Sequence, residues 1–151
     1  MRMQNNLFRI TLMFFVLGPW SAGTVSAMSE GNTAQSEPYV SGGIALGERE
    51  ALERRRADFS LWIATAAKKS GSYLADVRIK IADAAGKAVL DVRLDGPWLL
   101  VDLKPGRYTV DASFHDQSQR KTTSINRKGD HREMLFYYEV EAETLAPHAK
   151  D

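Results

Sequence analysis

The chain has 151 residues, which is enough for one domain with a core of its own. It contains no cysteine, so a disulfide framework, thiol chemistry and a lipid anchor on cysteine are all excluded. The 20 basic and 19 acidic residues nearly balance, which excludes the strong positive charge of a nucleic-acid-binding domain.

The first 27 residues have the three parts of a secretory signal peptide. Arg2 and Arg9 supply the positive charge, residues 10–17 form an apolar run, and Val25-Ser26-Ala27 places small or tolerated residues at a cleavage position. The apolar run is far shorter than the roughly 20 residues that span a bilayer. We therefore predict cleavage after Ala27, no stable membrane anchor afterwards, and a periplasmic or secreted product of a Gram-negative envelope.

Three further segments flank the main body of the chain. Residues 28–43 are rich in Ser, Gly, Asn and Glu, which predicts a flexible leader. Residues 44–57 predict a short helix, because good helix formers dominate and Glu50 precedes Arg54 by four positions. Residues 141–151 are typical of a frayed tail.

Residues 58–140 alternate between apolar and polar side chains, which predicts seven strands. The inward sets are Phe59, Leu61 and Ile63; Val77, Ile79 and Ile81; Leu90, Val92 and Leu94; Leu99, Val101 and Leu103; Tyr108, Val110, Ala112 and Phe114; and Met134, Phe136, Tyr138 and Val140. A Gln-, Ser- and Thr-rich strand ends near Asn126. The predicted fold is all-β, a seven-stranded antiparallel β-sandwich of transthyretin-like or Ig-like type, preceded by the short helix. Pro105-Gly106 predicts a type II turn with positive φ at Gly106.

Residues 83–87, 95–98 and 103–110 together carry a family resemblance. Their sequences, DAAGK, DGPW and LKPGRYTV, resemble the carboxypeptidase regulatory-like domain found in small exported proteobacterial proteins. The resemblance covers about residues 39–140 and implies a transthyretin-like sandwich in an exported protein. Lys104 departs from the pattern, where a second proline is frequent. In carboxypeptidases the domain is an accessory without catalytic residues, so the resemblance carries no activity to this chain.

Candidates for catalysis are few. A hydrolytic site needs a nucleophile, a base and an orienting group, but the three histidines, His115, His131 and His148, are scattered along the sequence. A metal site from His115, Asp116 and His131 would need strand ends to meet. Alternation places the His115 side chain on the solvent face of its strand, which argues against such a site. The run of three arginines from Arg54 fans around a helix, so a solvated face is favoured. We predict no catalytic residue, no bound metal and no cofactor.

Several large apolar side chains occupy strand positions that alternation assigns to the outward face, and they are the most informative departure from the pattern. Trp62, Trp98, Leu100, Leu135 and Tyr137 fall on the face opposite the inward sets of their own strands. One explanation is that the helix and residues 39–44 pack over this face. The other is a docking surface for a protein or a glycan, where Trp and Tyr are favoured anchors.

These observations favour an exported, non-catalytic binding or accessory module of the bacterial cell envelope. Its expected partner is an envelope protein or a cell-wall glycan, not a nucleic acid. Two alternatives remain open at this point. One is a small periplasmic enzyme or metal-handling protein on the same scaffold, and the other is a structural envelope component.

Overall fold

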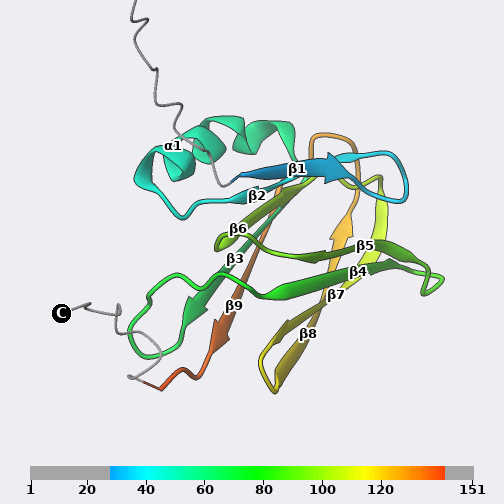
Figure 1. Ribbon diagram of the computed structural model, residues 1–151. Helices are drawn as coiled ribbons and strands as arrows, with labels where there is room; N and C mark the ends of the chain where they lie inside the picture. The colour runs from blue at the N-terminus through cyan, green and yellow to red at the C-terminus, as the bar shows by residue number, and fades with distance from the viewer. Residues whose placement is uncertain (1–27, 142–151) are drawn as a thin grey trace, which may run out of the picture.

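A computed structural model describes residues 28–141 of the chain, so the predicted signal peptide and nearly all of the predicted tail lie outside the described residues. The elements in order are β1 (Ser29–Asn32), β2 (Pro38–Gly42), α1 (Leu46–Arg55), η1 (Arg56–Asp58), β3 (Leu61–Ala67), β4 (Arg78–Asp83), β5 (Ala88–Arg93), β6 (Trp98–Val101), β7 (Gly106–Phe114), β8 (Gln117–Ile125) and β9 (Arg132–Tyr138). Figure 1 shows α1 above the strands and the end of β9 at the bottom. Within residues 28–141, no helix is long and apolar enough to cross a bilayer.

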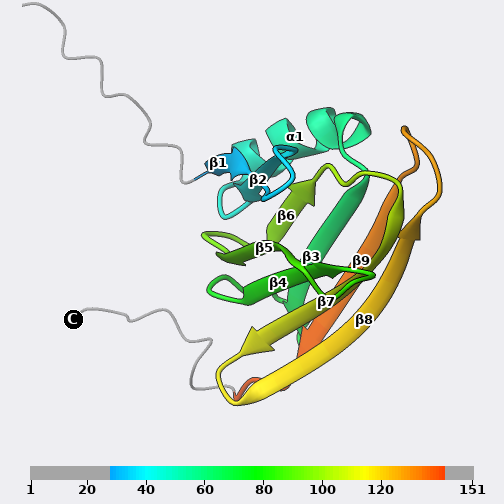
Figure 2. The same cartoon turned by 90° about the vertical axis from the view of Figure 1, so that its right-hand side faces the viewer.

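The strands form two sheets that face each other. Sheet A has the order β1-β2-β6-β3-β9, and sheet B has the order β5-β4-β7-β8. Figure 2 shows the two layers edge-on, with β8 and β9 along one side. The prediction of a mostly β protein with one short helix is confirmed. Residues 58–140 contain seven strands, β3 to β9, as predicted, but the described residues contain nine in all, so the sandwich is not seven-stranded. The helix follows two strands rather than preceding all of them.

The two additional strands come from the segment predicted to be a flexible leader. Thr33 organises the connection between them, because its hydroxyl accepts hydrogen bonds from the main-chain N–H groups of Gln35 and Glu37. Pro38 opens β2, a position where a strand tolerates proline. β2 then pairs antiparallel with β6. Polar composition indicated flexibility here, but local turn chemistry and pairing to a neighbouring strand determine the structure.

One strand pair departs from the predicted antiparallel arrangement. β3 and β9 run parallel, with Leu61 opposite Arg132 and Ala67 opposite Tyr138. Parallel neighbours need a long connection. In this chain the whole of sheet B and β6 lie between the two strands in sequence and provide that connection.

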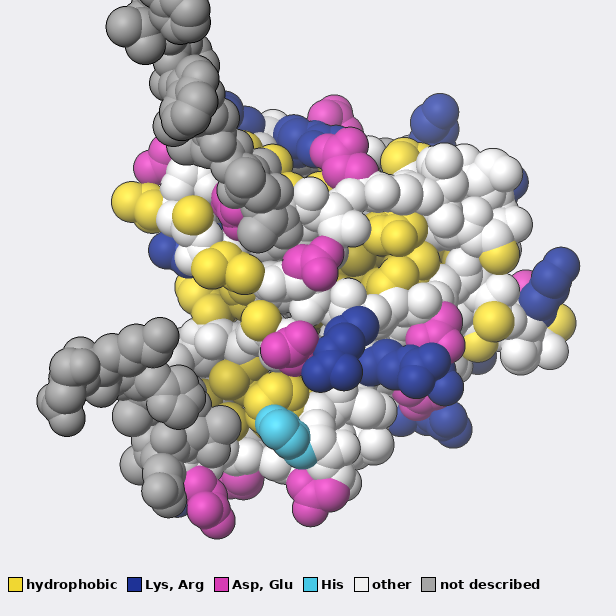
Figure 3. Space-filling view, viewed as in Figure 1, with side chains coloured by type: hydrophobic (Ala, Val, Ile, Leu, Met, Phe, Trp, Pro, Cys, Tyr) yellow, Lys and Arg dark blue, Asp and Glu magenta, His cyan; other side chains and the backbone are white. Residues whose placement is uncertain are grey.

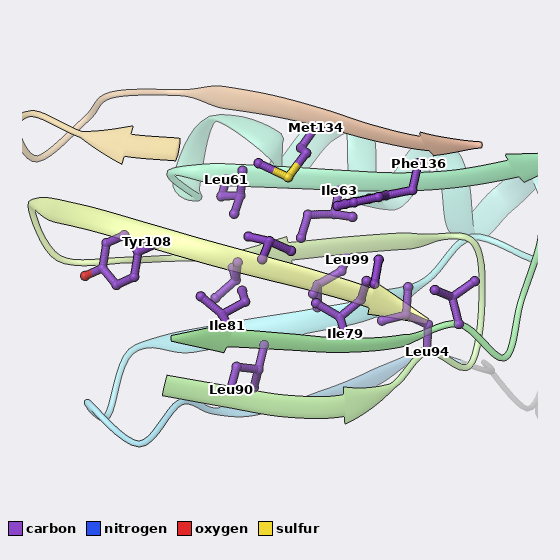
Figure 4. Close-up of a cluster of buried hydrophobic side chains, with 14 of the residues drawn as sticks. Leu61, Ile63, Ile79, Ile81, Leu90, Leu94, Leu99, Tyr108, Met134 and Phe136 are labelled. Atoms are coloured by element: carbon purple, nitrogen blue, oxygen red, sulfur yellow. The ribbon is translucent and has the colours of Figure 1, made fainter. Parts of the chain in front are cut away.

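The main core lies between the sheets and contains most of the predicted inward set. Figure 4 shows side chains from both sheets pointing toward one another. The buried residues that it labels are Leu61, Ile63, Ile79, Ile81, Leu90, Leu94, Leu99, Tyr108, Met134 and Phe136. Val92 lies opposite Ile79 but is only partly buried, because β5 is the edge strand of sheet B. Val89, which lies beside the register shift after Ile81, is a buried residue that was not predicted.

The predicted type II turn is absent. Gly106 has φ of +158° and already pairs with Ile125 as the first residue of β7, whereas a type II turn needs φ near +80°. The Tyr108 hydroxyl instead donates a 2.7 Å hydrogen bond to the Lys104 carbonyl oxygen. A buried tyrosine therefore bridges the bend that a main-chain hydrogen bond was expected to close.

Side chains of β8 cover the free edge of β9. The amide groups of Gln117 and Gln119 donate to the main-chain oxygens of Glu139 and Tyr137 at 2.7 and 2.6 Å. The Lys121 ammonium group continues the series on the carbonyl two residues earlier in β9. These bonds satisfy main-chain acceptors that an exposed edge strand leaves unpaired.

Candidate functional site

All five residues of the predicted aromatic patch lie on the outer face of sheet A. Register places Trp62 beside Leu100, and Ala64 between Trp98 and Leu135. Two positions further along β3, Ala66 lies beside Tyr137. Because alternate residues of a strand share a face, the five side chains project to one side, as the parity analysis predicted.

Most of this face is covered. A second cluster of buried residues fills it, made of Val40, Leu52, Phe59, Ala64, Trp98 and Leu100, with Met28, Trp62 and Leu135 partly buried against it. Only Tyr137 of the five predicted residues is strongly exposed. Trp98 retains 7% of its surface, so its ring is unavailable as a docking anchor.

Helix α1 and η1 supply the cover, as Figures 1 and 2 show. Leu52 is the one residue of α1 that is buried. Arg55 forms an ion pair with Glu30 and lies over the Phe59 ring, and Arg56 pairs with Glu133 on β9 at 2.7 Å. Two of the three consecutive arginines therefore attach the helical segment to the sheet, a role that the prediction of a solvated face missed.

Most of residues 39–44 do not lie over the face as one explanation required. Residues up to Gly42 belong to β2, inside sheet A, and extend the sheet sideways. Val40 from this strand contributes to the covered cluster. α1 and η1, together with Phe59, provide the layer above the sheet, and Gly43 lies beside the Trp98 ring.

Two tryptophans and a tyrosine form a braced series on this face. The Trp62 and Trp98 rings meet edge to face, with centroids 5.2 Å apart, and Tyr73 meets Trp98 in the same way at 5.9 Å. The Arg56 guanidinium lies 3.9 Å from the Trp62 centroid, and that of Arg49 lies 5.6 Å from the Tyr73 centroid. Ring contacts of this kind add attraction beyond buried area. The Tyr73 ring is therefore held in place before any partner arrives.

Beyond the covered cluster, two tyrosines remain exposed on either side of a small residue. Tyr73 pairs with Ala66 in a short antiparallel bridge, and Ala66 pairs with Tyr137 on the other side. Tyr73 is 51% exposed and Tyr137 is 47% exposed. Two strand spacings separate the tyrosine backbones, or about 10 Å. We call Tyr73, Ala66 and Tyr137 the tyrosine platform.

Charged residues close the platform on the side away from the helix. Lys68 and Glu139 lie two positions beyond Ala66 and Tyr137, and their side chains pair at 3.0 Å. Neither tyrosine hydroxyl of the platform has a hydrogen-bond partner among residues 28–141. The platform thus offers two aromatic rings and two free hydroxyl groups.

Sequence reasoning found Tyr137 and missed Tyr73. Tyr73 lies outside the nine strands, where alternation gives no signal. The available signal was the Lys-Lys-Ser-Gly-Ser turn before it, which returns the chain beside β3.

The outer face of sheet B has a different character. Arg78 and Asp91 pair across β4 and β5 at 2.8 Å, and Arg120 and Asp111 pair across β7 and β8 at 2.6 Å. Hydrogen bonds from the arginines hold the pKa values of Asp91 and Asp111 below the usual range. This ordinary solvated surface leaves sheet A as the face with exposed aromatic groups.

The histidines do not converge. His115 lies in the turn before β8, and His131 lies beyond its far end, so the length of β8, roughly 30 Å, separates them. The His131 Nδ1–H group donates to the Phe59 carbonyl oxygen at 2.9 Å. His148 lies outside the described residues. Within residues 28–141, no group of three or more His, Cys, Asp or Glu side chains is arranged to hold a metal ion.

Comparison with known proteins adds no relative to this description. No family model, no curated protein and no solved structure matches the chain.

Proposed function

We propose that this protein is an exported, non-catalytic binding or accessory module of the bacterial cell envelope, and that the tyrosine platform contacts its partner. The observation that carries the proposal is the pair of exposed tyrosines on a sheet face that is otherwise covered. Aromatic side chains at the margin of a packed layer are frequent anchors of binding energy. The partner is an envelope protein or a cell-wall glycan.

The bracing of Tyr73 supports a binding role for the platform. Contacts with Trp98 and Arg49 already restrict its ring. A partner that stacks on this ring therefore loses little side-chain entropy, which is one of the main costs of association.

The location and the family rest on the sequence. The first 27 residues have the charge, apolar run and small residues of a cleaved signal. The LKPGRYTV stretch supports membership of the carboxypeptidase regulatory-like group. Within this stretch, the hydrogen bond from the Tyr108 hydroxyl to the Lys104 carbonyl oxygen holds the bend before β7.

The test uses the full chain expressed for export and purified from the periplasm. A photoreactive amino acid at position 137 should crosslink to a partner protein in whole envelopes, or the protein should cosediment with purified peptidoglycan. Tyr137→Ser and Tyr73→Ser should each reduce that binding about tenfold or more, the usual loss at an anchor residue, with little change in melting temperature.

Leu46→Ala is the control, because Leu46 is an exposed apolar residue of α1, 65% exposed, that is not part of the platform. This variant should bind as the wild type does. The proposal would be refuted if both tyrosine variants bound the partner as tightly as the wild type does. It would also be refuted if the wild-type protein gave neither a crosslink nor cosedimentation.

A further inference from the structure

Two adjoining depressions open at the end of the sandwich where β7 turns into β8. Their volumes are about 1030 and 540 Å³, and they share Phe114, His115 and Val140. Figure 3 shows a histidine lying against hydrophobic side chains on this side of the molecule, with acidic side chains nearby. We call the combined space the end pocket.

The floor of the end pocket is apolar. Ala67, Leu74 and Phe114 are buried core residues whose remaining surface faces it, and Val140 is partly buried beside them. The Tyr138 ring packs against Phe114, with centroids 5.4 Å apart. An apolar floor beneath a polar rim is the usual composition of a small-molecule site.

The rim is held in a defined conformation. His115 has φ of +53° and Asp76 has φ of +63°, and these are two of the three non-glycine residues with positive φ in the described part of the chain. The His115 ring meets the Phe114 ring edge to face at 4.3 Å. Left-handed backbone is tolerated by Asp and His but is rare, and such residues gather at ligand sites.

The charge of the end pocket is negative. Its charged lining residues are Asp76, Asp116, Glu139, Glu141, Lys69 and Arg93. Asp76 is paired with Arg93 at 3.2 Å, and Glu139 is paired with Lys68, which lies outside the lining. Among residues 28–141, the carboxylates of Asp116 and Glu141 have no ion-pair partner, and neither does Lys69, so the unpaired groups of the lining carry a net negative charge. One carboxylate comes from the β7–β8 turn and the other from the segment after β9.

We propose that the end pocket binds an organic cation, an amine or guanidinium group attached to an apolar ring or chain. The apolar part packs on Phe114 and Val140, and the cation lies between the carboxylates of Asp116 and Glu141. The end pocket adjoins the tyrosine platform, because Tyr73 lines its smaller depression. The proposal does not rest on the proposed function, since the carboxylates that it uses, Asp116 and Glu141, lie outside the platform.

The test uses three probes of similar size and different charge with the isotope-labelled exported protein. Benzylamine should give saturable NMR shifts at the main-chain amides of His115 and Val140. Benzyl alcohol should bind about tenfold more weakly, and phenylacetate should bind more weakly still, because only the amine carries the complementary charge.

A double variant, Asp116→Asn with Glu141→Gln, keeps the shape of the pocket and removes its two unpaired negative charges. It should weaken benzylamine binding about tenfold while leaving benzyl alcohol unchanged. Glu50→Gln on α1 is the control, and it should bind benzylamine as the wild type does. Equal affinity for the amine and the alcohol, unchanged amine binding in the double variant, or the absence of saturable shifts would overturn the proposal.

Discussion

Replacing Leu52 with alanine tests whether the helix stabilises the domain through the outer face of sheet A. Leu52 is completely buried and is the one residue of α1 that is buried in the covered cluster. Leu46 is the same residue type in the same helix but is 65% exposed. Alanine at position 46 therefore controls for the change in helix composition without disturbing the cluster.

The expected cost follows from the burial of the side chain. A buried leucine truncated to alanine costs 2–5 kcal/mol, and we take about 3 kcal/mol because the helix can settle toward the sheet. For a domain of this size, each kcal/mol lowers the melting temperature by about 4 °C, so the expected decrease is about 12 °C. Domains of this kind have a total stability of only about 5–15 kcal/mol, so the loss is a large fraction.

Thermal melts followed by circular dichroism give the melting temperatures, and urea unfolding gives the free energies. Trp62 and Trp98 belong to the same cluster as Leu52, so their fluorescence reports directly on loss of the cover. Leu46→Ala should melt within about 2 °C of the wild type, as a surface substitution does. If Leu52→Ala also stays within that range, the helix is not an energetic part of the fold.

Three further substitutions test separate features. Gly96→Ala should destabilise the domain by about 1–3 kcal/mol, because the added Cβ would overlap the Gly42 carbonyl oxygen. Gly47→Ala is the control and should be neutral or stabilising, because Gly47 lies on α1 with open space around it. Equal urea midpoints for the two variants would contradict this prediction. Tyr108→Phe should cost about 1 kcal/mol in urea unfolding by removing a 2.7 Å hydrogen bond, and an unchanged midpoint would show that the bond contributes nothing. Burial raises the pKa of Tyr138 to about 12, so the folded state holds this proton more tightly than the unfolded state and stability should fall as pH rises from about 10 to 12. Tyr138→Phe should reduce that fall and should not destabilise at neutral pH, since the buried hydroxyl has no partner in the described residues; a large loss at pH 7 would contradict it.

The strands were predictable where alternation persisted over several residues. Tyr108, Val110, Ala112 and Phe114 are all buried, as their spacing indicates. Alternation reports which face a residue occupies, but it does not report which strands are neighbours. The parallel pairing of β3 with β9 depends on how the sheets close in three dimensions, and no local pattern encodes it.

The hairpin in the expected leader shows a second limit. Its strands are four and five residues long and contain few apolar side chains. Composition alone is therefore typical of flexible chain. Pairing of β2 with β6 overrides that tendency, because main-chain hydrogen bonds do not depend on side-chain polarity.

The sequence predicted which face of the sheet carries the aromatic patch, but it did not predict which of its residues are exposed. Parity placed Trp62, Trp98 and Tyr137 on one side of sheet A correctly. Which of them stays exposed depends on where the helix ends above the sheet, and the α1 sequence has only a weak apolar stripe to indicate that. The end pocket was not predictable, since it combines a turn, a loop and a strand end that are distant in sequence.

The parallel pair of β3 and β9 has a consequence for the order in which the chain can fold. β3 becomes an inner strand of sheet A only when β9, the last strand within residues 28–141, lies beside it. A chain that emerges with its N-terminus first therefore cannot finish this sheet until almost all of it is available. Contacts between such distant segments also slow folding, because a long loop must close before they form. The topology thus keeps the growing chain from reaching its final structure early.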